Sequence, residues 1–216
     1  MFHRLASLFL TAATAFSGVA IAQPAAPIEG QDYAVIDPPV ATLSGDRIEV
    51  AEVFGYSCVH CAHFAPIISE WKKSQPADVR VEYVPAVFGG IWEIYARVYY
   101  TAESLGVLDL THDQLFEALH TERRPINKIE DIADFYAEHG VDKDNFLATL
   151  NSFPVNAQIE TARKRAMGWG VDATPTMIVA GKYKVQAPRE GGFKRMLEIV
   201  DALVAKERAA QSPSKK

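Results

Sequence analysis

Cysteine is scarce in this chain, with two residues among 216. Both lie in one segment, Cys58-Val59-His60-Cys61. A disulfide across so short a loop removes little conformational entropy from the unfolded chain, so it would stabilise the fold only weakly. A chain of this length also buries a core without disulfide bonds. The pair is therefore better explained by chemistry, and redox exchange at a Cys-x-x-Cys motif is the first candidate.

Other kinds of cysteine site lack residues that they need. Ala62 follows Cys61 where a c-type haem attachment site needs histidine. A structural zinc site takes four protein ligands, and the sequence has neither a second Cys-x-x-Cys motif nor a histidine pair to complete one. A carrier that binds a metal ion through Cys58, Cys61 and His60 stays open as an alternative. His63 is interpreted as a surface or packing residue.

Excess positive charge and long apolar runs are also missing from most of the chain. The net charge of -5 gives no indication of nucleic acid as a partner. One apolar stretch, Leu5 to Ile21, follows His3 and Arg4, is diluted by small residues and ends at Ala20-Ile21-Ala22. This pattern is typical of a secretory signal peptide cleaved near Ala22, and it is short for a membrane anchor. We therefore predict an exported, soluble protein.

The apolar pattern of the first half predicts a strand, a helix and a second strand. Arg47–Tyr56 and Val79–Val87 have the β-branched and aromatic content of strands. Between them, four apolar residues from Phe64 to Trp71 have the i, i+3, i+4, i+7 spacing of a helix face. This helix is predicted to begin near Cys58 and to end by Gln75-Pro76.

A helical region is predicted after Gly89-Gly90 and extends to about Met167. Within it, residues 111–114 and 127–130 resemble capping boxes, and Gly140 resembles a helix stop. Several short helices are therefore expected.

Strand character returns at residues 176–180 and 182–185, joined at Gly181, and an amphipathic helix follows from Phe193 to Leu203. A β-α-β unit, an insertion and a β-β-α unit together indicate the α/β class, as a thioredoxin fold with an inserted helical cap. The predicted parts are a signal peptide (1–22), a first thioredoxin-fold part (23–88), a helical insertion (89–162), a second thioredoxin-fold part (163–208) and a polar tail (209–216).

Three segments resemble the DsbA family of periplasmic thiol-disulfide oxidoreductases, and the resemblance extends over almost all of the chain after residue 22. These segments are Glu52–Cys61, Thr174-Pro175-Thr176 and Val179–Tyr183. Val59 departs from the pattern, because the family's best-known active site has proline there. The resemblance implies an oxidase that passes its Cys58-Cys61 disulfide to reduced, unfolded exported proteins, without another cofactor. It also implies reoxidation by a membrane quinone-linked partner of the DsbB type.

The position of the cysteines predicts different roles for them. A helix N-terminus offers unpaired backbone N–H groups and a partial positive charge, which favour a thiolate at Cys58. Cys61, one turn further along, is expected to be the resolving thiol. The ring of His60 could donate to the Cys58 sulfur or add positive charge beside it. A histidine that merely faces solvent is the alternative.

Three further site residues depend on the resemblance. Glu52 lies in an otherwise apolar strand, and spacing alone leaves open an outward carboxylate on an edge strand. The resemblance implies an acid beneath the disulfide that moves protons, with its pKa raised by burial. It also implies a cis peptide bond before Pro175, with the Thr174 backbone opposite the disulfide, where it can bind an extended substrate segment.

Two other functions stay open. A periplasmic reductase or isomerase would use the same cysteines, although the dimerisation region of the usual isomerase is missing. A module that binds peptides in the groove of the cap would not need the cysteines at all.

Overall fold

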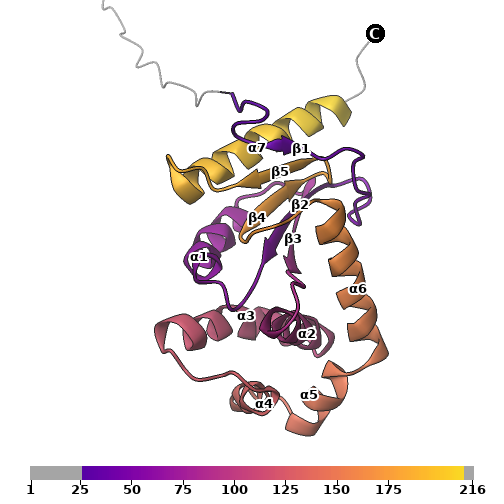
Figure 1. Ribbon diagram of the computed structural model, residues 1–216. Coiled ribbons are helices and arrows are strands. Elements are labelled where there is room, and N and C mark those ends of the chain that lie inside the picture. The colour runs from indigo at the N-terminus through magenta and orange to yellow at the C-terminus, as the bar shows by residue number, and fades with distance from the viewer. Residues whose placement is uncertain (1–25, 212–216) are drawn as a thin grey trace, which may run out of the picture.

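The computed structural model describes residues 26–211 and shows a central sheet with helices on both faces (Figure 1). The predicted signal peptide at residues 1–22 lies outside the described residues. The strands are β1 (Ala34–Val35), β2 (Ile48–Phe54), β3 (Val79–Pro85), β4 (Thr176–Val179) and β5 (Tyr183–Gln186). Their order is β1-β5-β4-β2-β3, in which β2 and β3 are parallel and the other neighbours are antiparallel.

β2 lies inside the sheet, and all seven of its residues are buried. It pairs with β3 on one side and with β4 on the other. A strand that is covered on both faces is apolar on both faces, which explains why its sequence is nearly continuous in apolar residues. The alternative of an edge-strand position for Glu52 is therefore wrong.

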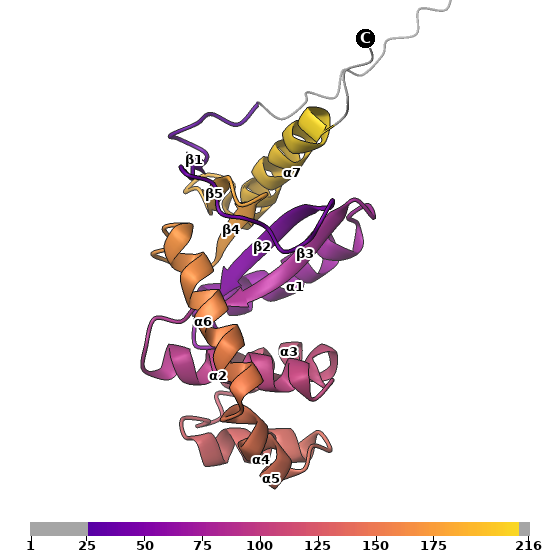
Figure 2. The same ribbon diagram turned by 90° about the vertical axis from the view of Figure 1, so that its right-hand side faces the viewer.

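The helices divide between the two faces of the sheet and one of its ends (Figure 2). α1 and α7 cover one face, and α6 covers the other. The bounds of these helices are Val59–Lys73 for α1, Phe153–Gly168 for α6 and Gly192–Gln211 for α7.

The side-chain alternation of β2 decides which residues meet which helices. Ile48 and Val50 pack in the cluster that contains residues of α1 and α7. Ala51 and Val53 pack in the cluster that contains residues of α6. Glu52 has the same parity as Ile48 and Val50, so its side chain lies on the face that α1 covers.

The predicted insertion forms a helical cap beyond one end of the sheet (Figure 2). Its interior is rich in buried aromatic rings, among them Tyr95, Phe116, Phe135 and Tyr136. No helix within residues 26–211 is long and apolar enough to cross a membrane. The cap contains α2 (Ile91–Ser104), α3 (Leu108–Phe116), a π-helical turn (Glu117–Thr121), α4 (Ile129–Glu138) and α5 (Lys143–Leu150).

Two predicted boundaries differ from the structure. The boundary between residues 162 and 163 falls inside α6, which packs against α2 in the cap and reaches the sheet through Arg165 and Glu49. The cap therefore has no chain break or linker at this point. α7 continues to Gln211, so the helix extends into the segment that was predicted to be a polar tail.

The local helix signals in the cap are confirmed only in part. The prediction of a helix start at residues 111–114 is wrong, because Thr111 lies inside α3 and its hydroxyl donates to the Val107 carbonyl. At residues 127–130 the prediction is displaced by one position: Asp131, and not Glu130, accepts the backbone N–H groups of Asn127 and Lys128, just before α4. Gly140 does follow the end of α4, with a φ of 82° that suits glycine.

Candidate active site

Cys58 lies at the N-terminus of α1, directly after a tight turn from the end of β2. The Cys58 N–H donates to the Gly55 carbonyl at 3.0 Å, which closes this turn. The Cys58 sulfur then caps the helix by accepting the Cys61 N–H at 3.3 Å. Gly55 permits the close packing of the turn on the cap, because a Cβ at this position would overlap the ring of Trp92.

The pKa values of the two cysteines are shifted in opposite directions. The pKa of Cys58 is lowered to about 5 because the Cys61 thiol, and then the backbone N–H groups of Cys61 and His60, donate hydrogen bonds to its sulfur. The pKa of Cys61 is raised, because its proton is held by Cys58 and its side chain is fully buried. In the reduced protein, Cys58 is therefore the thiolate and Cys61 the thiol.

His60 contributes to the site through its main chain. The hydrogen bond from His60 that lowers the pKa of Cys58 comes from the backbone N–H. The side chain is exposed and lines a hollow beside the cysteines.

Glu52 is a buried acid on the same face of β2 as the cysteine helix. It is 3 % exposed and is aligned with Tyr83 on β3 and Met177 on β4. Burial, with a smaller contribution from the negative charge of Cys58, raises its pKa to about 8. The predicted burial and the direction of the pKa shift are therefore both present.

The Thr174-Pro175 segment lies beside Cys58, although 116 residues separate Thr174 from it. The Thr174-Pro175 peptide bond is cis, as expected. The Thr174 carbonyl is 3.5 Å from the Cys58 sulfur. β4 begins at Thr176 and pairs with β2, so the sheet itself brings this segment to the cysteines.

Comparisons with the sequences of known proteins identify the family of this chain. A family model described as a DSBA-like thioredoxin domain matches residues 93–198. The thiol:disulfide interchange protein DsbA of Pseudomonas aeruginosa is 43% identical over 181 residues, which cover 84% of this chain and 86% of that protein. This chain belongs to the DsbA family. The DsbA of Azotobacter vinelandii is also similar, with 38% identity over 182 residues.

Solved DsbA structures have the same architecture. A crystal structure of Pseudomonas aeruginosa DsbA has a TM-score of 0.81 and 42% identity, and covers 85% of this chain and 96% of its own. The DsbA of Xylella fastidiosa has a TM-score of 0.80 and 41% identity, with 85% and 98% covered. The predicted thioredoxin fold with a helical insertion is confirmed, and the chain is a thiol-disulfide oxidoreductase.

A shallow hollow beside the two cysteines includes residues that the sequence analysis missed. It has a volume of about 410 Å³. Gln186 joins it because β5 pairs with β4, which aligns Gln186 with Thr176. Extending the predicted hairpin by its register would have located Gln186, whereas Phe193 on α7 had no local signal. The lining residues are His60, Ala173, Thr174, Pro175, Gln186, Ala187, Gly192 and Phe193.

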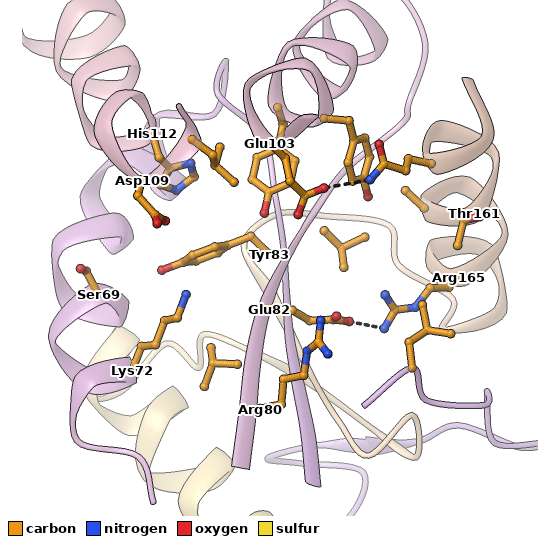
Figure 3. A pocket seen from close by; sticks show the side chains of 18 of the residues that line it. Ser69, Lys72, Arg80, Glu82, Tyr83, Glu103, Asp109, His112, Thr161 and Arg165 are labelled. Atoms are coloured by element: carbon orange, nitrogen blue, oxygen red, sulfur yellow. Dashed lines mark hydrogen bonds and ion pairs between the residues drawn. The ribbon is translucent and has the colours of Figure 1, made fainter. Parts of the chain in front are cut away.

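A second hollow of about 730 Å³ extends along β3, and none of the predicted site residues line it (Figure 3). Lys72 of α1, Tyr83 of β3, His112 of α3 and Arg165 of α6 contribute to its walls. Within residues 26–211, no group of three or more His, Cys, Asp or Glu side chains is arranged to hold a metal ion.

Proposed function

We propose that this protein donates its Cys58-Cys61 disulfide to reduced, unfolded proteins exported to the periplasm. The observation that carries the proposal is the position of the Cys58 sulfur at the N-terminus of α1, where it accepts the Cys61 N–H at 3.3 Å beside a fully buried Cys61. This position lowers the pKa of Cys58 to about 5 and raises that of Cys61. A stable thiolate favours the reduced form of the enzyme and makes Cys58 a good leaving group. Both effects favour the transfer of a disulfide to the substrate.

The first step is attack on Cys58. A substrate thiolate forms a bond to the Cys58 sulfur, the Cys58-Cys61 bond breaks, and Cys61 leaves as a thiolate that takes up a proton. Glu52 is the proposed source of this proton, because its pKa of about 8 keeps it protonated at neutral pH. Its charge also interacts with Cys61.

The second step releases the product. A second substrate thiolate attacks the substrate sulfur of the mixed disulfide, and Cys58 leaves as a thiolate. Two substrate thiols have then lost two electrons to the cysteine pair, which is left reduced. A membrane quinone-linked partner of the DsbB type is proposed to reoxidise it, and no other cofactor takes part.

Thr174 and Pro175 are proposed to bind the substrate chain. The Thr174 backbone lies beside Cys58 and can pair with an extended segment as a short added strand. The hollow next to it is lined by the ring of Phe193 and by alanines, so it suits an apolar side chain of that segment. His60 borders the same hollow, where its ring would adjoin the bound chain, and its backbone N–H stabilises the Cys58 thiolate.

The proposed route to the periplasm depends on residues 1–22, which have the pattern of a cleaved signal peptide.

The equilibrium of the cysteine pair with glutathione tests the direction of transfer. In a buffer with equal millimolar concentrations of reduced and oxidised glutathione, we expect the reduced enzyme to predominate. An enzyme that is mostly oxidised in this buffer would favour the reductase or isomerase alternative. A Val59→Pro variant, measured in parallel, reports how far Val59 changes the equilibrium.

A further inference from the structure

Two histidines of the cap hold Tyr56, the residue two positions before Cys58. The Tyr56 hydroxyl shares a hydrogen bond of 2.8 Å with Nδ1 of His112. The Tyr56 carbonyl accepts a hydrogen bond of 2.7 Å from Nε2 of His120. A carbonyl only accepts, so Nε2 of His120 carries the hydrogen. The cap thus holds both the side chain and the main chain of Tyr56.

Tyr56 is one of the two central residues of the turn that carries Cys58. The bond from the Cys58 N–H to the Gly55 carbonyl defines a β-turn with Tyr56 and Ser57 at its centre. The orientation of the central peptide distinguishes the common types of β-turn. The carbonyl of this peptide is the Tyr56 oxygen, so the bond from His120 fixes that orientation.

Ser57 gives the turn no comparable anchor. Its hydroxyl is buried and has no hydrogen-bond partner among the described residues. Tyr56, by contrast, is 1 % exposed and packs against the rings of Phe116 and Tyr95 in the cap. The cap therefore holds the turn through Tyr56.

The π-helical turn explains how both histidines reach Tyr56. Residues eight positions apart on a regular α-helix differ in direction by about 80°. Glu117–Thr121 is wound as a π-helix, whose wider turn reduces this difference and brings His120 toward the side of His112. His112 is fixed in turn by stacking on Tyr83, with ring centroids 4.9 Å apart (Figure 3). Single π turns are frequent at functional sites.

We propose that His112 and His120 are positioning residues for the redox reaction, which fix the Gly55–Cys58 turn and thereby the direction of the Cys58 sulfur toward the first N–H groups of α1. The thiolate gains its hydrogen bonds only when the sulfur points at these groups. The proposal rests on the redox role of Cys58. It adds that the cap takes part in the stabilisation of the thiolate, besides covering the site.

His120→Leu is the variant that tests the proposal, because it removes the donor to Tyr56 and keeps a similar apolar volume. We expect the pKa of Cys58 to rise, measured by the ultraviolet absorbance of its thiolate against pH. The fraction of reduced enzyme at equilibrium with glutathione should fall in parallel. The loss of one hydrogen bond limits the change in each equilibrium constant to roughly three- to tenfold.

Two further variants separate positioning from general stability. His120→Gln keeps an N–H near the position of Nε2 and should restore the wild-type pKa of Cys58 within roughly twofold in the ionisation constant. His139 is the matched control, because it is another half-buried cap histidine bonded to a backbone carbonyl, that of Phe135, at 2.8 Å. His139→Leu should lower the stability of the cap and leave the pKa of Cys58 unchanged.

The proposal is wrong if His120→Leu changes the pKa of Cys58 no more than His139→Leu does. Should His120→Leu fail to fold, nitrogen NMR of the unaltered enzyme decides: at neutral pH His120 must carry its hydrogen on Nε2, and a hydrogen on Nδ1 alone overturns the proposal. If the wild-type enzyme has no oxidase activity, the proposed function is wrong instead. The two failures are therefore distinct.

Discussion

Cys58 and Cys61 differ in how far solvent reaches them. The side chain of Cys58 is 8 % exposed and that of Cys61 is fully buried. Only Cys58 also has a lowered pKa, so it is both the more accessible and the more ionised thiol. A substrate sulfur should therefore bond to Cys58 alone.

Replacement of each cysteine tests this difference. We expect Cys58→Ser to abolish thiol exchange, because Cys61 is buried and protonated. We expect Cys61→Ser to accumulate mixed disulfides with substrates, because no resolving thiol remains to release them. Non-reducing gels of the two variants, incubated with a reduced, unfolded protein, measure both results. Mixed disulfides formed by Cys61 in the Cys58→Ser protein would reverse the assignment.

Glu52→Gln tests the proposed proton donor. Because burial raises its pKa to about 8, Glu52 carries a proton at neutral pH that Gln cannot supply. We expect turnover to fall by roughly tenfold or more at neutral pH. Above about pH 8 the wild-type enzyme also loses this proton, so the ratio of variant to wild-type rate should rise. A ratio that stays constant across pH would show that Glu52 moves no proton in the rate-limiting step.

The stability of Glu52→Gln gives a second measurement. The pKa of Glu52 is higher in the folded protein than its ordinary value of 4.5. Its contribution to stability is therefore fully present below about pH 4.5 and is lost as the pH rises through about 8. Gln does not ionise, so the variant should gain stability relative to the wild type over this range. Denaturant unfolding at several pH values, with far-ultraviolet circular dichroism as the probe, measures the gain.

Among the elements, α6 has an ion-pair network that joins this helix to the sheet. Arg165 bonds to Glu49 on β2 and to Glu82 on β3, and its guanidinium lies over the ring of Trp169 at 4.5 Å. The side chain of Glu49 is 1 % exposed. A carboxylate buried to this degree needs its partner, since an unpaired buried charge is costly.

Arg165→Ala should therefore destabilise the protein strongly, by about 3 kcal/mol or more. Arg163 is the matched control on the same helix. Its side chain is 34 % exposed and pairs with Glu93 and Glu160, so Arg163→Ala should cost about 1 kcal/mol or less. Chemical denaturation of both variants measures the difference. Equal losses would show that burial of the network adds nothing to its strength.

The sequence predicted most of the elements, because their apolar periodicity is strong. The helix after Cys58, the strands at β2 and β3 and the final hairpin lie close to their predicted positions. β1 was missed because a strand of two residues is too short to show a period. The helical region was predicted to about Met167, close to the end of α6, but the domain boundary was placed inside this helix at residues 162–163, where no glycine or proline interrupts the sequence. A π-helical turn has no sequence signal that the analysis could have used.

The site residues that lie close together in the sequence could be predicted from it. Cys58, Cys61 and Glu52 lie on one strand and the helix that follows it, and the resemblance added Thr174 and Pro175. Gln186 and Phe193 reach the same hollow through the register of the hairpin and the packing of α7. The position of Gln186 follows from extending the predicted hairpin, whereas that of Phe193 depends on how α7 packs on the assembled sheet, which the sequence does not show.

For the whole molecule, the redox state of one cysteine pair should change the free energy of unfolding. The folded protein lowers the pKa of Cys58 from 9.0 to about 5, and this stabilises the reduced form. The short loop between the cysteines gives the oxidised form little entropic advantage. We therefore expect the reduced protein to be the more stable at neutral pH.

The pH dependence of this difference follows from the direction of the shift. A pKa lowered by folding contributes stability that is fully present above the unfolded value of 9.0 and is lost as the pH falls through about 5. The difference between the two redox forms should therefore shrink in acid. Denaturant unfolding of both forms from neutral to strongly acidic pH measures it. An oxidised form that is more stable at neutral pH would indicate a reductase, with Val59 as the first residue to test.

The course of α6 through both parts of the molecule also limits how such a protein can evolve. Deleting residues 89–162 would leave residues 163–168 of α6, less than two turns of helix. Such a fragment is too short to persist by itself, and Ala51, Val53 and Ile178 would lose the cover of Val155 and Ile159. The cap therefore cannot be removed or transplanted without also replacing part of this helix. Any change that removes the cap must therefore also supply another helix over this face of the sheet.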